Sequence, residues 1–170
     1  PKLICGIYVT VVRGTPMALQ LFIMAFVVLA IRGFPVLVTA IIAFGINSGA
    51  YVSENIRAGI LSVDVGQTEA GRSLGLSSGA TMWYIVIPQA IKNVIPSIGN
   101  ELIALIKETS VVSFVGAADL YVAFNYIGSN SYEFMVPYLV MAAIYIVLVL
   151  VISILVKLME RSLKKSDRRH

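Results

Sequence analysis

The fold is decided by residues 134–156, which read FMVPYLVMAAIYIVLVLVISILV and contain no charged residue. A helix that crosses the hydrocarbon core of a bilayer needs about 20 mostly apolar residues. Because each backbone polar group must be satisfied within such a segment, this run predicts a transmembrane helix. The whole chain is 58% hydrophobic and 13% charged, whereas a soluble domain carries about 25% charged residues. The composition therefore predicts an all-α membrane protein.

Three further spans are predicted before this run, at about Ile7–Ile31, Val36–Val52 and Val94–Ala118. The first contains the sequence Arg13-Gly14-Thr15-Pro16, which predicts a broken or kinked helix near its start. The chain shows no internal repeat and no second soluble domain. Residues 1–170 are therefore interpreted as one polytopic transmembrane domain, a bundle with four helices present.

Residues 53–93 lie between the second and third predicted spans and are too polar for a lipid-facing helix. The turn residues Ser77–Gly79 divide this segment, so short helices joined by a turn are expected, and Pro88 and Pro96 are expected to start or break helices. A basic tail, residues 157–170, follows the last span. The positive-inside bias and attraction to anionic lipid predict that this tail is cytoplasmic. Counting back across the spans places residues 53–93 on the cytoplasmic side too.

Several classes of function are disfavoured by composition. The net charge of +4 is concentrated in the basic tail, so it does not indicate a nucleic-acid-binding surface. His170 is the only histidine and Cys5 the only cysteine. A metal site and Cys/His chemistry are therefore not expected.

A compound motif occupies the polar segment. It consists of Glu69-Ala70-Gly71, Gly75 four residues later, and Ile87-Pro88-Gln89-Ala90. This pattern resembles the EAA signature of bacterial ABC importer permeases, with Gly71 in place of the second alanine. The flanking sequences resemble the polar amino acid permease family: Arg13-Gly14-Thr15-Pro16, Gln20-Leu21-Phe22, Ala50-Tyr51, Arg57-Ala58-Gly59-Ile60, Gly66-Gln67 and Lys107-Glu108-Thr109-Ser110.

The resemblance implies a type I importer permease fold with five spans, the first of which would precede Pro1. It implies a non-catalytic, multi-pass subunit of the bacterial inner membrane that passes amino acids. Its expected partners are two ATP-binding subunits, an identical or homologous second permease and an extracytoplasmic substrate-binding protein. ATP and Mg would be bound by the ATPase, so no cofactor is expected in this chain.

The same resemblance assigns residues 53–93 to a cytoplasmic coupling loop that docks on the ATPase. It carries this role to Glu69, Ala70, Gly71 and Gly75. Small residues would allow close approach to the partner, and Glu69 can make a charge-assisted hydrogen bond or a cap. The alternative interpretation is an amphipathic surface helix followed by a glycine turn.

Two carboxylates lie within the third predicted span. Glu101 and Glu108 are seven residues apart, which places them near one helix face. A charge near the bilayer centre costs at least about 2.5 kcal/mol, so these groups are expected to face a bundle interior or a wet cavity. A ligand site for basic amino acids such as arginine, lysine or histidine is the first hypothesis, and glutamine or another polar amino acid is the alternative. The competing structural interpretation pairs Glu108 with Lys107 or Arg57 and makes Glu101 a cap of the helix entered at Pro96.

Polar and apolar side chains on the first two spans complete the candidate substrate site. Asn47, Ser48 and Tyr51 could donate or accept hydrogen bonds, while Met24 and Phe22 could form an apolar wall. As single residues, all five are also common at helix contacts.

The two carboxylates would also suit two other classes of protein, a proton-coupled carrier and an intramembrane enzyme. A proton-coupled carrier could use the two carboxylates as relays, but it would have no use for the EAA-type loop. An intramembrane enzyme would have Glu101, Glu108 and Ser110 as candidates, and the sequence offers no metal-ligand set or Ser/His pair to support them.

Overall fold

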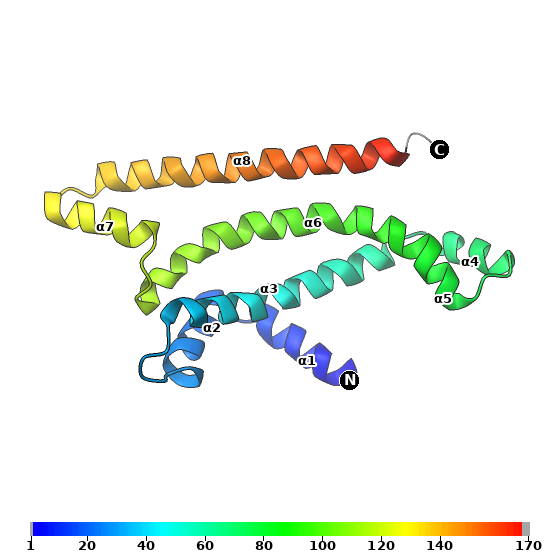
Figure 1. Cartoon of the computed structure of the whole chain (residues 1–170), viewed down its shortest axis with the longest axis horizontal. Coiled ribbons are helices and arrows are strands. Elements are labelled where there is room, and N and C mark those ends of the chain that lie inside the picture. The colour runs from blue at the N-terminus through cyan, green and yellow to red at the C-terminus, as the bar shows by residue number, and fades with distance from the viewer. Residues whose placement is uncertain (1, 168–170) are drawn as a thin grey trace. The chain divides into compact units, whose positions relative to one another are not determined.

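The computed structural model describes the backbone of residues 2–167 and the side chains of residues 2–162, and this part of the chain is helical without strands. Figure 1 shows the order of the elements. The α-helices are α1 (Lys2–Arg13), α2 (Met17–Ile23), α3 (Val36–Leu61), α4 (Val65–Ser73), α5 (Ser78–Thr81), α6 (Ile87–Glu108), α7 (Leu120–Ser131) and α8 (Met135–Asp167). Short π-helical segments follow α2 and α5, at η1 (Met24–Val28) and η2 (Met82–Val86), and a 3-10 helix, η3 (Thr109–Val115), follows α6.

Within the described residues, α3 and the Met135–Ser162 part of α8 are each long and apolar enough to cross a membrane. Two bent pairs can each supply one more span: Lys2–Arg13 with Met17–Val28, bent by 108°, and Ser78–Val115 with Leu120–Ser131, bent by 58°. If each pair counts as one span, the number agrees with the four spans predicted. The α8 run is apolar on every side, as expected of a helix that contacts lipid or another helix.

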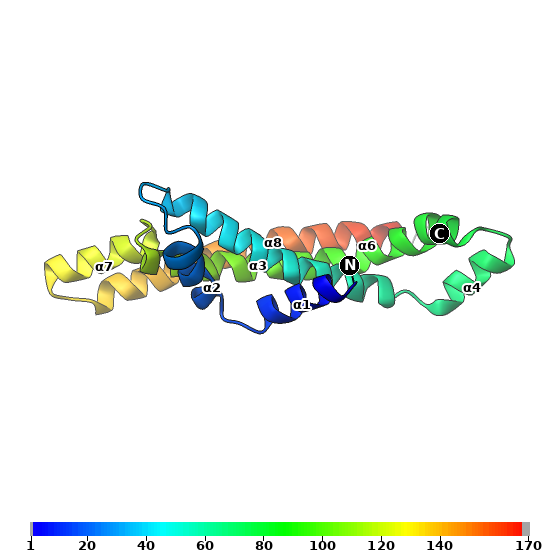
Figure 2. The same ribbon diagram turned by 90° about the horizontal axis from the view of Figure 1, so that it is seen from below.

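The first bend lies where the sequence predicts a broken helix. Helix α1 ends at Arg13, and Gly14 still donates its N–H to the Thr10 carbonyl. Pro16 then stands at the N-cap of α2 with an extended backbone, because its ring cannot continue the preceding helix. Figure 2 shows the resulting change of direction between α1 and α2.

Three boundaries differ from the sequence-based expectation. Helix α3 continues to Leu61, nine residues past the predicted end of the span at Val52, and Pro96 lies inside α6 without ending it. Residues 120–131, which lie between the third and fourth predicted spans, form α7. Asp119 begins this helix because its side chain accepts a hydrogen bond from the Val122 N–H at 2.8 Å.

The basic tail predicted at residues 157–170 continues α8 as far as Asp167. Lys157 and Arg161 belong to the described part and are exposed. Residues 168–170, and the side chains from residue 163 onward, lie outside the described residues.

The chain divides into two compact units. The first comprises residues 1–51 and 102–152. Its core contains Leu21, Ala40, Ala43 and Val115, and partly buried side chains pack against them. Helix α7 is tied to α8 within this unit, because Asn125 donates a hydrogen bond to the Tyr138 hydroxyl at 3.1 Å.

The second unit comprises residues 52–101 and 153–170. It contains the α4–α5 hairpin and parts of three longer helices. Glycines allow these helices to approach closely: a Cβ built on Gly59 would lie 2.1 Å from a methyl of Val94, and one on Gly99 would lie 2.4 Å from a methyl of Val156. No side chain larger than hydrogen fits at either contact without displacement of its neighbour.

Candidate functional site

A partly buried amide network connects α1, α2 and α3 within the first unit. The two side-chain N–H groups of Gln20 are shared among three acceptors: the Val12 carbonyl at 2.7 Å, the Thr15 carbonyl at 3.1 Å and the Thr15 hydroxyl at 2.7 Å from Nε2. Its oxygen accepts a bond from the Asn47 amide at 3.0 Å. The bend at Pro16 places these carbonyls beside α2, so Gln20 satisfies groups that a straight helix would bond internally.

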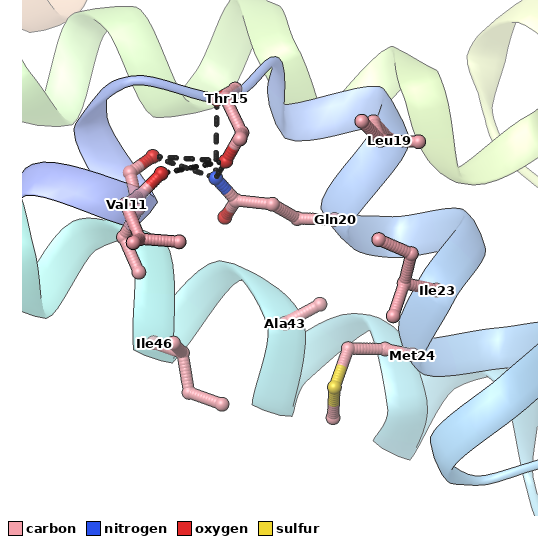
Figure 3. Close-up of a pocket in the computed structure, with 9 residues that line it drawn as sticks. Val11, Thr15, Leu19, Gln20, Ile23, Met24, Ala43 and Ile46 are labelled. Atoms are coloured by element: carbon pink, nitrogen blue, oxygen red, sulfur yellow. Dashed lines mark hydrogen bonds between the residues drawn. The ribbon is translucent and has the colours of Figure 1, made fainter. Parts of the chain in front are cut away.

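Figure 3 shows the hydrogen bonds of Gln20 with the residues of α1 and the bend, at the edge of a small pocket of about 200 Å³. The pocket is lined chiefly by aliphatic side chains and Met24. Its volume is below the 300–1,000 Å³ typical of ligand sites. The pocket is therefore large enough for part of a ligand or for a side chain, and its polar groups are already used by Gln20, Thr15 and Val12.

The three polar residues predicted on α3 have distinct surroundings. Asn47 is 3% exposed and is held by Gln20, whereas Ser48 and Tyr51 are partly exposed. The guanidinium of Arg13 stands 5.4 Å from the centre of the Tyr51 ring, a cation–π distance. Asn47 and Ser48 lie four and three positions before Tyr51, so each is a neighbour of Tyr51 on the surface of α3.

A second contact of α1 closes on the same stretch of α3. The Tyr8 hydroxyl donates a hydrogen bond to the Ile46 carbonyl at 2.5 Å, next to Asn47 in sequence. A Cβ on Gly49 would lie 3.1 Å from the same hydroxyl. Two contacts thus join α1 to α3: the hydrogen bond from Tyr8 to Ile46 and the cation–π contact between Arg13 and Tyr51. Asn47 and Ser48 lie between these two contacts in the sequence of α3.

The two predicted apolar wall residues lie in different surroundings. Met24 lines the small pocket and also packs against the core of the first unit. Phe22 packs against that core and against Phe26, with ring centres 6.1 Å apart, and does not line the pocket.

The two carboxylates predicted within the third span, Glu101 and Glu108, lie on α6. Glu101 is partly exposed, and Glu108 is exposed at the last residue of the helix. The interpretation of Glu101 as a helix cap is wrong, because α6 begins at Ile87 and Glu101 lies in its middle. Arg57, considered as a partner for Glu108, forms a two-pronged ion pair with Glu54 at 2.7 and 2.9 Å.

The α4–α5 hairpin carries the four residues expected to couple to an ATPase. Asp64 starts α4 by accepting the Gly66 N–H at 2.6 Å. At the end of α4, Gly75 has φ +84°, with its N–H bonded to the Arg72 carbonyl and the Leu76 N–H bonded to the Gly71 carbonyl. This is a Schellman ending, in which glycine adopts the left-handed backbone conformation at no steric cost.

The four residues expected to couple to an ATPase differ in how far the hairpin buries them. Glu69 and Ala70 are exposed, whereas Gly71 is the one buried residue of α4. A Cβ on Gly71 would lie 2.8 Å from Ile85 and 2.9 Å from Thr81. The absence of a side chain on Gly71 therefore allows α4 to pack closely against Thr81 and Ile85, and Gly75 allows the turn that follows α4. Glu69 and Ala70 remain exposed on the surface of the hairpin.

The roles of Gln20, Thr15 and Asp64 were not predicted from the sequence. Gln20 could have been singled out, because an amide side chain in an uncharged apolar run needs hydrogen-bond partners within the protein. Those partners could not be identified from the residue spacing, because Val12 and Thr15 come close to the Gln20 amide only through the bend before Pro16. Among the residues that the structure describes, no group of three or more His, Cys, Asp or Glu side chains could hold a metal ion.

Comparisons with known proteins agree with this arrangement. Residues 2–165 match the family described as "Binding-protein-dependent transport system inner membrane component". The chain is 42% identical over 166 residues to "Arginine transport system permease protein ArtQ" of Bacillus subtilis, covering 96% of this chain and 76% of that protein. It is 40% identical over 165 residues to "Putative glutamine transport system permease protein GlnP" of Rickettsia typhi, covering 95% and 75%.

A third relative, "L-cystine transport system permease protein TcyB" of Bacillus subtilis, is 39% identical over 165 residues, covering 94% of this chain and 69% of that protein. Among solved structures, the chain is similar to one titled "Crystal structure of an amino acid ABC transporter with histidines". The two share 44% sequence identity with a TM-score of 0.88, over 95% of this chain and 76% of that chain.

Proposed function

The chain belongs to the family of binding-protein-dependent transport system inner membrane components, and we propose that it forms the amino acid pathway of an ATP-driven importer. The observation that carries this proposal is the α4–α5 hairpin in a chain of membrane-spanning helices. Such a hairpin gives a separate motor a rigid element to push, and relatives matched over nearly the whole chain are named as amino acid permeases.

We infer that the substrate is a basic amino acid such as arginine, lysine or histidine. Glu101 and Glu108 on α6 support this choice, since a carboxylate in a membrane protein favours a cationic ligand and matches guanidinium with two hydrogen bonds. Asn47, Ser48, Tyr51, Met24 and Phe22 remain the candidate contacts from α2, η1 and α3. Glutamine is the second candidate, favoured by the relatives named as glutamine permeases.

The substrate proposal is tested by replacing Glu101 with glutamine. In vesicles that contain the assembled transporter, Glu101→Gln should lower the uptake ratio of arginine to glutamine by roughly tenfold or more, the effect of losing one hydrogen bond to a charged group. Glu160→Gln, the same change near the end of α8, is the matched control and should leave the ratio unchanged. An unaltered ratio in Glu101→Gln would remove this carboxylate from the site.

ATP hydrolysis is proposed to occur on two copies of a separate subunit, which would bind ATP and Mg, so that this chain needs no cofactor. A second permease, identical or homologous, would complete the pathway, and an extracytoplasmic binding protein would deliver the substrate. In this arrangement the hairpin and the basic end of α8 face the cytoplasm of a bacterium, in contact with the inner membrane and its lipid.

Glu69 and Ala70 are proposed to contact the ATPase directly, while Gly71 and Gly75 maintain the shape of the hairpin. Glu69→Lys should abolish stimulation of ATP hydrolysis by loaded binding protein, because it reverses a charge on the exposed face of α4. Glu160→Lys again serves as the control. Stimulation equal to wild type in Glu69→Lys, with the complex intact on gel filtration, would contradict the assignment.

A further inference from the structure

The turn between α7 and α8 contains a strained tyrosine. Tyr132 has φ +54°, in the left-handed region, and among the described residues it is the one non-glycine with a positive φ. The Glu133 N–H then bonds to the Gly128 carbonyl at 3.1 Å, which closes the end of α7. Gly75 adopts the same backbone conformation after α4, where it costs nothing. A side chain at this position costs free energy, so glycine would end α7 with less strain than tyrosine does.

The chain itself gives the Tyr132 ring almost no compensating contact. The side chain is 94% exposed, so it buries very little surface against its own protein. Backbone strain of this kind persists where the residue serves a further purpose. Because that purpose is not packing within the chain, it is contact with something outside the chain.

The surroundings of Tyr132 are apolar. Between Asp119 and Lys157 the sequence has one charged residue, Glu133. Its carboxylate accepts the Val136 N–H at 3.1 and 3.2 Å and so caps the start of α8. The first side chains after it are exposed and apolar: Phe134, Met135 and Val136. This composition suits contact with lipid, because a docking protein would find no second charge here.

The length of α8 gives the depth of Tyr132 in a bilayer. Lys157 is the first charged residue after the start of α8 and marks one edge of the hydrocarbon core. A core of about 30 Å takes about 20 helical residues, so its other edge falls close to Pro137. Tyr132 precedes Pro137 by five residues. It therefore lies roughly 5–8 Å beyond the core, at the depth of the headgroup layer.

Helix α7 agrees with this depth. It runs beside the first turns of α8, because the Asn125 amide bonds to the Tyr138 hydroxyl and the Tyr121 and Tyr138 rings stack with centres 6.3 Å apart (Figure 1). Tyr126 follows Asn125 and is 70% exposed, so it stands near the edge of the core. Tyr126 and Tyr132 thus lie close to the membrane–water boundary, where tyrosine is enriched because its ring is apolar and its tip polar.

We propose that Tyr132 binds phospholipid in the headgroup layer, on the side of the membrane opposite the basic end of α8, and anchors the turn between α7 and α8 there. The upper part of the acyl chains covers the ring, and an ester carbonyl or phosphate oxygen accepts a hydrogen bond from the hydroxyl. This contact offsets the backbone strain and holds α7 at a fixed depth. The inference depends on α8 crossing a membrane and not on which substrate is transported.

The first test measures depth by fluorescence of the whole transporter in phospholipid vesicles. Trp83 is the only tryptophan of the chain, so Trp83→Phe provides the parent, whose signal is subtracted. Tyr132→Trp adds a reporter that keeps an amphipathic ring. Two exposed positions calibrate the measurement: Ile146→Trp, midway along the apolar run of α8, and Leu74→Trp, next to the turn of the α4–α5 hairpin.

Quenching by iodide and by brominated lipids reports access from water and from the bilayer. Iodide should quench Tyr132→Trp at least about threefold less than Leu74→Trp, because the headgroup layer limits access of an anion. Lipid brominated near the headgroup end of its chains should quench Tyr132→Trp more than lipid brominated near the chain end, and Ile146→Trp should show the reverse order.

Two fluorescence results would overturn the proposal. The first is iodide quenching of Tyr132→Trp equal to that of Leu74→Trp, with no quenching by either brominated lipid. The second is iodide quenching of Tyr132→Trp that falls only when the purified binding protein is added, which would make the ring a contact for that protein.

The second test uses the sign of one change in melting temperature, measured in the same vesicles. Tyr132→Gly removes the strain and the ring together. Loss of strain alone would raise the melting temperature, whereas loss of a lipid anchor should lower it by about 2–4 °C. Tyr132→Asn, which also tolerates the left-handed conformation, should lower it too. Tyr132→Trp should stay within about 1 °C of the parent. An unchanged or higher melting temperature in both the glycine and the asparagine variants would overturn the proposal.

Discussion

Replacing Gln20 with leucine should destabilise the first unit by about 2–4 kcal/mol. The change preserves the approximate volume and removes the amide. Asn47, at 3% exposure, would lose its acceptor, and an unsatisfied buried donor costs about 1–3 kcal/mol. The bonds to Val12 and Thr15 add roughly 1 kcal/mol, since side-chain hydrogen bonds in membrane proteins average about 0.6 kcal/mol each.

The measurement is unfolding of the purified permease in SDS, followed by helical circular dichroism. Gln67→Leu is the matched control, because Gln67 is exposed and its contact with Gln89 is long, at 3.3 Å. This control should cost less than about 0.5 kcal/mol.

A double-mutant cycle separates the network from simple loss of packing. Gln20→Leu combined with Asn47→Leu should cost about 1 kcal/mol less than the sum of the single changes, because removing both partners leaves no orphaned donor. Strict additivity, or a cost of Gln20→Leu no greater than that of Gln67→Leu, would refute the role assigned to the network.

Three other substitutions test contacts within one unit each. Gly75→Ala should cost roughly 1–2 kcal/mol, because φ is +84° there, and should weaken ATPase stimulation; a variant with wild-type stability would contradict the Schellman ending. Gly99→Ala should cost about 1–3 kcal/mol by crowding Val156, and Val156→Ala in the same chain should recover part of this in SDS unfolding; no recovery would mean that the two residues do not touch. Tyr8→Phe should cost about 0.5–1.5 kcal/mol through loss of the bond to Ile46, with melting temperature as the readout and Tyr132→Phe, at a 94% exposed site, as the control.

The long apolar runs allowed α3 and α8 to be predicted, because hydrocarbon imposes both length and helicity on such segments. The break before Pro16 was predictable for an equally local reason, the missing N–H and the ring of proline. Helix α7 was not predicted, because its 12 residues are too few to span a membrane and it ends in residues typical of turns, Gly128–Ser131. The Asn125 amide donates hydrogen bonds to the hydroxyls of Tyr121 and of Tyr138 on α8. The contact with Tyr138 joins two helices and cannot be predicted from a local sequence pattern.

The candidate site shows the same division. The motif around Glu69 could be recognised from sequence, but the distinct tasks of Gly71 and Gly75 depend on which side of α4 faces α5. No role could be predicted for Gln20 from the sequence, because its acceptors at Val12 and Thr15 come within reach only through the bend. Whether Glu101 and Glu108 bind a substrate stays a prediction.

The glycine contacts in the second unit determine how stiff that unit is. A contact between two long side chains is compliant, since rotamer changes can absorb a displacement of an ångström or more. Where Gly59 meets Val94 and Gly99 meets Val156, one side has no rotatable bond and the other is a β-branched residue with few rotamers. These contacts therefore yield little when one helix is displaced. A displacement of the hairpin should be passed to the neighbouring parts of α3, α6 and α8 with little loss.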